Sequence, residues 1–171
     1  IDLRIKADVR VIGDPMQLEQ VLLNLCINAR DAVEEAKPQH PRIDIIVDGV
    51  ELDQTQTPAG IGAGAFLRIE VSHNGAGMDE EVRQRIFDPF FTTKAVDQGT
   101  GLGLSTALAI MQDHGGWLRC DSEASEGTQF TAILPMTVAQ TEQAMTPTKP
   151  VDLPGGDETI LVIDDEEMVR T

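Results

Sequence analysis

A short glycine-rich stretch is the first part of this sequence whose composition suits a chemical task. Residues 99–104 read Gly-Thr-Gly-Leu-Gly-Leu, and an apolar segment of helical period follows them. Glycines free the backbone N–H groups of a helix start, where the helix dipole favours anions such as phosphate. The stretch lacks the Gly-Lys-Ser/Thr of a P-loop, and a loop rather than a strand precedes it. Taken alone, it is equally consistent with a flexible hinge.

Two asparagines supply candidate ligands for a cation. Asn24 and Asn28 lie four residues apart, and Asp31 follows three residues later, so all three share one face of a helix. The side-chain carbonyl of Asn28 is a hard oxygen ligand of the kind that Mg²⁺ accepts beside substrate phosphates. A solvated polar face is the alternative.

Two further segments are chemically suggestive. Residues 74–77 read Asn-Gly-Ala-Gly after a strand-like run, and glycines there allow the backbone to approach a flat ligand, although ordinary turns contain glycine too. Residues 87–94 hold three phenylalanines, which should pack rather than be exposed. They end at Lys94, which is either a phosphate contact or a surface lysine. We expect residues 87–94 to act as a lid.

Regular elements must position these residues. The apolar period predicts a helix over 14–36, with Asp14 as its cap and Pro15 in its first position. A helix over 102–114 should stop at Gly115 and Gly116. The remaining elements are a helix over 79–87 and strands over 42–50, 65–72, 117–122 and 128–134.

Length and charge limit the function classes. The 171 residues allow one domain with a full core and some extra chain, and the net charge of −16 argues against non-specific nucleic-acid binding. No apolar run approaches the ~20 residues of a membrane helix. We expect Cys26 and Cys120 to be reduced thiols in a cytoplasmic protein. Because the chain begins at Ile1, we expect a piece of a longer protein, in which upstream anchors or sensors would not be visible.

The C-terminal part has a different character. Thr, Gln, Pro and Gly dominate from residue 137 to 157, which is typical of a linker. Residues 159–163 then form a short apolar run, followed by Asp164 and Asp165. We therefore predict one domain over 1–136, a linker over 137–157, and the truncated start of a second domain over 158–171.

The motifs, in this order, resemble the ATP-binding catalytic domain of sensor histidine kinases, in the family shared with gyrase-type and chaperone-type ATPases. The resemblance covers residues 2–136 and implies an α+β fold of the Bergerat type. This fold is a two-layer sandwich whose mixed, mostly antiparallel sheet is covered on one face by three helices. The motifs are an N box at 20–32, glycine boxes at 71–78 and 99–104, an F box at 86–94, and Gly-Thr-x-Phe at 127–130.

The resemblance assigns roles in binding ATP and Mg²⁺. Asn28 would coordinate Mg²⁺, with Asn24 and Arg30 nearby, and Lys94 would approach the terminal phosphate. Gly75, Gly77 and Thr128 would border or fix adenine. The residues expected to hold the phosphates through their backbone are Gly99, Gly101, Leu102, Gly103 and Leu104.

Two positions depart from family patterns. Asn24 stands where gyrase-type and chaperone-type relatives have a water-activating glutamate, and an amide cannot act as a general base. The site therefore suits phosphoryl transfer to a protein. His73 stands where the family has an aspartate that accepts a hydrogen bond from the adenine amino group. Loss of a charged acceptor costs ~1–3 kcal/mol, so we expect weaker ATP binding or an altered base preference, unless Asn74 or a water substitutes.

The tail resembles the opening strand of a response-regulator receiver domain, although a plain strand with an acidic end is the alternative. Together these features imply a hybrid sensor histidine kinase, homodimeric at full length. It would transfer the γ-phosphoryl group of Mg·ATP to a histidine on dimerisation helices upstream, and its later partner would be the receiver domain or a response regulator. Since His40, His73 and His114 lack the setting of that histidine, we expect nucleotide binding without autophosphorylation. The alternatives are a regulatory nucleotide-binding module, favoured by His73, and an ATPase, disfavoured by Asn24.

Overall fold

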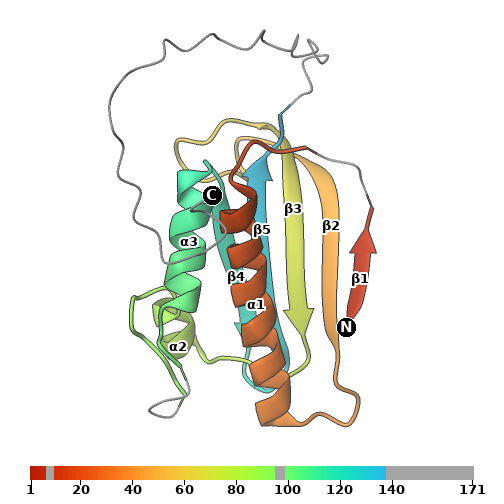
Figure 1. The fold of residues 1–171 in the computed structure, drawn as a ribbon, viewed down its shortest axis with the longest axis vertical. Coiled ribbons are helices and arrows are strands. Elements are labelled where there is room, and N and C mark those ends of the chain that lie inside the picture. The colour runs from red at the N-terminus through yellow and green to blue at the C-terminus, as the bar shows by residue number, and fades with distance from the viewer. Residues whose placement is uncertain (7–9, 95–98, 138–171) are drawn as a thin grey trace, which may run out of the picture. The chain divides into compact units, whose positions relative to one another are not determined.

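One five-stranded sheet organises the protein. The computed structural model describes residues 1–6, 10–94 and 99–137, and within these ranges three helices lie on one face of the sheet (Figure 1). The elements, in chain order, are β1 (Asp2–Ile5), α1 (Pro15–Ala36), β2 (Ile43–Leu52), β3 (Gly64–His73), α2 (Glu80–Arg85), α3 (Gly103–Asp113), β4 (Trp117–Glu123) and β5 (Gly127–Pro135).

The strand order is β1-β2-β3-β5-β4, and only the pairing of β1 with β2 is parallel among the described strands. This arrangement confirms the predicted mixed, mostly antiparallel sheet. In the register of β3 and β5, His73 pairs with Thr128. The ends of two central strands therefore place these two residues side by side, under the helices.

The main core lies between the helices and the sheet. Val21, Leu25 and Ala29 form the buried stripe of α1 and pack over Val71 of β3 and Met111 of α3. The opposite face carries a smaller cluster of Phe66, Trp117 and Ile133, with Val50, Leu52 and Ile61 against it. The sheet thus buries apolar side chains on both faces, which makes it a rigid support for the helices.

The helix ends follow the predicted signals. The Asp14 side chain accepts hydrogen bonds from the N–H groups of Met16 and Gln17, and α1 ends before Lys37, which has a left-handed φ of 48°. At the end of α3, the Gly115 N–H donates to the carbonyl of Gln112. These caps fix where each helix begins and stops, and therefore which residues face the space between α1 and α3.

Two sequence expectations need correction, and others fall outside the described residues. Strand β1 was not predicted. Phe90 is 73% exposed, so the prediction that all three phenylalanines pack is wrong for Phe90. Its φ of 67° and its backbone hydrogen bond to Gly101 turn the side chain outward. Phe87 and Phe91 do pack against the core. The expected linker (137–157) and receiver strand (158–171) lie outside the described residues, apart from Thr137.

No helix in the described ranges 1–6, 10–94 and 99–137 is long and apolar enough to cross a membrane.

Candidate nucleotide-binding site

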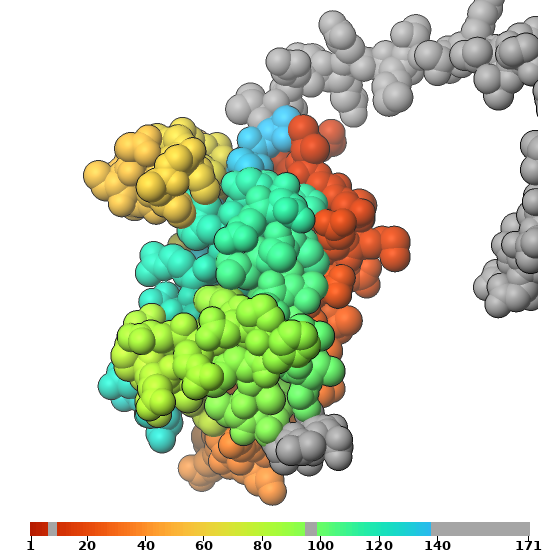
Figure 2. Space-filling model, turned by 90° about the vertical axis from the view of Figure 1, so that its left-hand side faces the viewer, coloured from red at the N-terminus to blue at the C-terminus, as the bar shows by residue number. Residues whose placement is uncertain are grey.

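A cavity of about 340 Å³ lies between α1, α2, the loop after α2 and the start of α3. Its volume falls in the range of about 300–1,000 Å³ that is usual for small-molecule sites. In Figure 2, α3 and the segment that contains α2 lie next to each other on the face that is shown. The described lining is Asn24, Ile27, Asn28, Asp31, Met78, Val82, Ile86, Phe91, Thr92, Thr93, Lys94, Gly99, Thr100, Gly101, Gly103 and Leu104.

The polar wall of the cavity comes from α1. The Asn28 amide nitrogen donates to the backbone carbonyl of Asn24 at 2.9 Å, which leaves its side-chain oxygen available for another partner. The Asn24 amide nitrogen donates to the carbonyl of Gly103, also at 2.9 Å. Asn28 is thus oriented by its own helix, whereas Asn24 joins α1 to α3.

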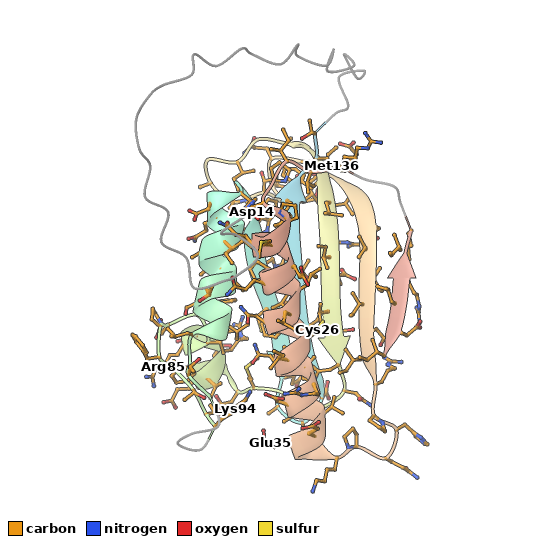
Figure 3. The ribbon with its side chains drawn as sticks, in the orientation of Figure 1. Asp14, Cys26, Glu35, Arg85, Lys94 and Met136 are labelled. Atoms are coloured by element: carbon orange, nitrogen blue, oxygen red, sulfur yellow. The ribbon has the colours of Figure 1, made fainter. Side chains whose placement is uncertain are left out.

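A charged group lies at one side of the cavity. The Lys94 ammonium is 2.5 Å from one carboxylate oxygen of Asp31, and the Arg30 guanidinium donates to the other oxygen at 2.6 and 2.9 Å. Figure 3 shows Lys94 between the loop after α2 and the C-terminal half of α1. Although partial burial alone would raise the pKa of Asp31, hydrogen bonds from Lys94 and Arg30 hold that pKa below its ordinary value. Arg30 itself is absent from the described lining.

The start of α3 is open to an anion. Leu102 is the N-cap residue, is absent from the described lining, and donates its own N–H to the Thr100 hydroxyl at 3.3 Å. No described side chain caps the first turn of α3 itself, which leaves the N–H groups of that turn available to a ligand. Gly101 has a φ of 65°, and an added Cβ would lie 2.4 Å from the carbonyl carbon of Phe90, so only glycine fits here. At Gly99 an added Cβ would approach Thr92 and the stem of Lys94. The glycines thus hold the loop close to α3.

Four predicted adenine contacts are absent from the described lining: His73, Gly75, Gly77 and Thr128. The glycines instead permit close packing of backbones. A Cβ on Gly75 would lie 2.4 Å from the carbonyl of Ala32, and one on Gly77 would lie 1.8 Å from the carbonyl oxygen of Glu123. Both glycines therefore seat the segment after β3 against α1 and against the β4–β5 turn.

A polar network lies behind the apolar end of the cavity. The Ser122 hydroxyl accepts from the Met78 N–H and lies within hydrogen-bond distance of the Thr128 hydroxyl, at 2.9 Å in both cases. Because Met78 lines the cavity, this network connects Thr128 to the cavity wall indirectly, through Ser122 and Met78. The network fixes Thr128 in place.

His73 is buried and has a defined hydrogen-bonding role. Its Nδ1 accepts from the Gly75 N–H at 3.1 Å, and burial lowers its pKa, so the ring is neutral with its proton on Nε2. The Asn74 side chain is already engaged nearby, because its oxygen accepts from the Arg42 N–H and its amide nitrogen donates to the His40 carbonyl. That Asn74 or a water substitutes for the usual aspartate stays a prediction.

Sequence reasoning missed the apolar lining and the role of Asp31. Met78, Val82 and Ile86, in and around α2, give the cavity an apolar end. The period of α2 could have indicated Val82 and Ile86, four residues apart, as one face. The ion pair of Asp31 with Lys94 joins residues 63 positions apart, and no local pattern indicates it.

The described residues fit a Mg²⁺ ion that would be held largely by phosphate oxygens and waters, with few protein ligands. No group of three or more His, Cys, Asp or Glu side chains suited to a metal occurs in the part of the chain that the structure describes. The oriented oxygen of Asn28 is a single hard ligand in the cavity. Mg²⁺ usually takes one or two protein ligands beside phosphates and waters, and the single Asn28 oxygen is consistent with that coordination.

Comparisons with known proteins agree on the family. A profile described as "Histidine kinase-, DNA gyrase B-, and HSP90-like ATPase" matches residues 13–138. The sensor kinase CckA of Brucella abortus is 37% identical over 170 residues, covering 94% of this chain and 18% of CckA. The sensor protein FixL of Bradyrhizobium diazoefficiens is 38% identical over 125 residues, covering 73% of this chain and 22% of FixL.

A solved structure gives the same result for the fold. The catalytic domain of the histidine kinase ThkA, in a nucleotide-free form, matches with a TM-score of 0.57 and 30% identity, covering 78% of this chain and 79% of that one. The chain spans about a fifth of the length of the two curated relatives. It belongs to the histidine kinase-, DNA gyrase B- and HSP90-like ATPase family, as an ATP-binding catalytic domain of the sensor histidine kinase type.

Proposed function

We propose that this chain binds Mg·ATP in the cavity and passes the γ-phosphoryl group to a histidine on dimerisation helices of the same full-length protein. The observation that carries the proposal is the convergence on one cavity of Asn28, Lys94 and the uncapped start of α3. These supply an oxygen for the metal, a cation for phosphate, and backbone N–H groups for anions. The apolar end of the cavity suits a base.

The choice of transfer over hydrolysis rests on the absence of a general base. Asp31 and Lys94 are the only ionisable side chains among the described lining residues, and they are paired with each other. The lowered pKa of Asp31 makes its carboxylate a weak base, and Asn24 cannot accept a proton at neutral pH. Positioning and electrostatics then supply most of the rate enhancement, as is usual for phosphoryl transfer.

At the adenine end of the cavity, we place His73 within reach of the nucleobase and Thr128 behind it, with Gly75 and Gly77 shaping the backbone there. Arg30 acts through Asp31, and Leu102 marks the start of the helix that receives the phosphates.

Transfer to a separate acceptor tests the proposal. The chain is mixed with the dimerisation helices of the full-length protein and γ-labelled ATP, with Asn28→Ala as the control. Label on the acceptor histidine, lost with Asn28→Ala, supports a kinase. Steady release of inorganic phosphate without an acceptor would instead show an ATPase.

A second candidate is a nucleotide-binding regulatory module without catalysis. The buried, neutral His73 favours it, because a neutral ring replaces the charged acceptor of the family. Tight nucleotide binding with no transfer to the acceptor would support this candidate over the kinase.

For the wider protein, we propose a homodimeric hybrid kinase whose catalytic region is cytoplasmic. Residues 158–171 would then be the start of its receiver domain. The similarity to CckA supports this extension, because it covers 94% of the chain, whereas the family profile matches only residues 13–138.

A further inference from the structure

Asp31 is the one acidic side chain in the described lining of the cavity, where a polyanion is expected to bind. Its side chain is 22% exposed, and that of Lys94 is 30% exposed, so their ion pair is partly shielded from water. A carboxylate in this place acts against a triphosphate because it occupies the Lys94 ammonium, which a terminal phosphate needs as its partner.

The two cations on Asp31 come from different elements of the fold. Arg30 belongs to α1 and donates twice to Asp31, so this pair is held within one helix. Lys94 lies in the loop after α2 and reaches Asp31 from a segment 63 residues further along the chain. Asp31 therefore keeps a compensating charge when Lys94 leaves, and Lys94 is the exchangeable partner.

We propose that Asp31 determines how strongly the site distinguishes ATP from ADP. In the nucleotide-free protein Asp31 holds Lys94. A terminal phosphate must take Lys94 from Asp31, whereas a nucleotide without that phosphate leaves the ion pair intact. Asp31 thus weakens ATP binding selectively and pins residues 91–94 to α1 until ATP arrives. This inference rests on the proposed function, in which Lys94 contacts the terminal phosphate.

The test compares Mg·ATP and Mg·ADP affinities of the 171-residue chain and of Asp31→Asn by calorimetry. We expect Asp31→Asn to bind ATP about three- to tenfold more tightly, the scale of a partly shielded ion pair, and ADP equally. The matched control is Glu34→Gln, which removes the same charge one turn further along α1, at 70% exposure, without touching Lys94. It should change neither affinity by more than about twofold because solvent and salt screen it.

Two further measurements separate this role from a merely structural one. In Asp31→Asn/Lys94→Met, the gain in ATP affinity should vanish relative to Lys94→Met alone. Hydrogen exchange at residues 91–94 should be faster in nucleotide-free Asp31→Asn than in the wild type, and equal in their ATP complexes.

The outcomes distinguish two kinds of failure. If the wild type binds no ATP, the proposed function is wrong, and the inference is wrong with it. If the wild type binds ATP but Asp31→Asn leaves the ratio of ATP to ADP affinity unchanged, or lowers it, the inference alone is overturned. Unchanged exchange at residues 91–94 in the nucleotide-free variant would contradict the pinning.

Discussion

The side-chain amide nitrogen of Asn24 lies 2.9 Å from the backbone carbonyl oxygen of Gly103 and donates a hydrogen bond to it. This bond joins the middle of α1 to the first residue of α3, and both residues line the cavity. An ionised carboxylate has no proton to donate, so an acidic residue at position 24 could not make this contact. Asn24 therefore both removes a general base from the site and supports the helix start.

Asn24→Asp should destabilise the fold more than Asn24→Ala. Alanine loses one hydrogen bond, which costs about 1 kcal/mol, whereas aspartate adds an unpaired carboxylate beside a carbonyl and costs about 1–3 kcal/mol. The free energy of unfolding in urea measures both. Gln20→Ala, at an exposed position one turn earlier on α1, is the control and should stay near the wild type. Equal stability of Asn24→Asp and the wild type would show that the bond contributes nothing.

Gly77→Ala should destabilise the protein by steric overlap. Its Cβ would lie 1.8 Å from the Glu123 carbonyl oxygen and 2.8 Å from that of Gly127, so the β4–β5 turn must move. Overpacking of this kind costs about 1–3 kcal/mol or more. Thermal unfolding measures the loss. Gly62→Ala has no atom within 4 Å of its new Cβ and is the matched control. A melting temperature for Gly77→Ala as high as that of Gly62→Ala would contradict the close approach of these backbones.

Sequence patterns were enough to predict most of the elements and the order of the motifs. The helix of α1 has a side-chain cap, a proline in its first turn and a strict apolar period, and these are local signals. Strand β1 has only four exposed residues, Asp2–Ile5, and it exists because it pairs with β2, some forty residues later. Such a partner cannot be read from a short window of sequence.

The candidate site likewise combines residues that local motifs predict with contacts that no local motif predicts. Asn28 and the glycines before α3 lie in local motifs, and the structure brings them to one cavity. The pairs Asn24–Gly103 and Asp31–Lys94 are contacts between distant segments, and they appear only once α1, α3 and the loop after α2 are packed together. The glycines of residues 74–77 were expected at adenine, but their need for close backbone packing depends on the position of α1 at Gly75 and of the β4–β5 turn at Gly77.

The tautomer of His73 leads to a prediction about the base. Since Nδ1 accepts from the Gly75 N–H, the remaining ring nitrogen, Nε2, presents a donor, whereas an aspartate presents acceptors. A donor suits the 6-oxo group of guanine better than the 6-amino group of adenine. In the proposed site, His73→Asp should therefore bind ATP about five- to tenfold more tightly and GTP more weakly than the wild type, a change of about 1 kcal/mol. Competitive titration of ATP and GTP into both proteins measures the ratio. Identical ratios would sink the idea that His73 contacts the base.

The same histidine should make the stability depend on pH. Burial lowers the folded-state pKa of His73 below 6.5, so the unfolded chain takes up a proton at a higher pH than the folded protein does. The free energy of unfolding should therefore be unaffected by His73 well above pH 6.5 and fall as the pH drops through that value, by at most about 1.4 kcal/mol per pH unit. The loss stops growing once the pH is below the folded-state pKa.

His73→Asn isolates this contribution. Its side-chain oxygen can accept from the Gly75 N–H as Nδ1 does, but it does not titrate. Urea unfolding from pH 8 to pH 5 should show the wild type losing stability relative to His73→Asn only at the acid end. His40→Asn changes an exposed histidine and should follow the wild type throughout. If the free energies of unfolding of the wild type and His73→Asn instead change in parallel across this range, His73 is not held neutral by burial. The assignment of the ring proton to Nε2 would then be wrong as well.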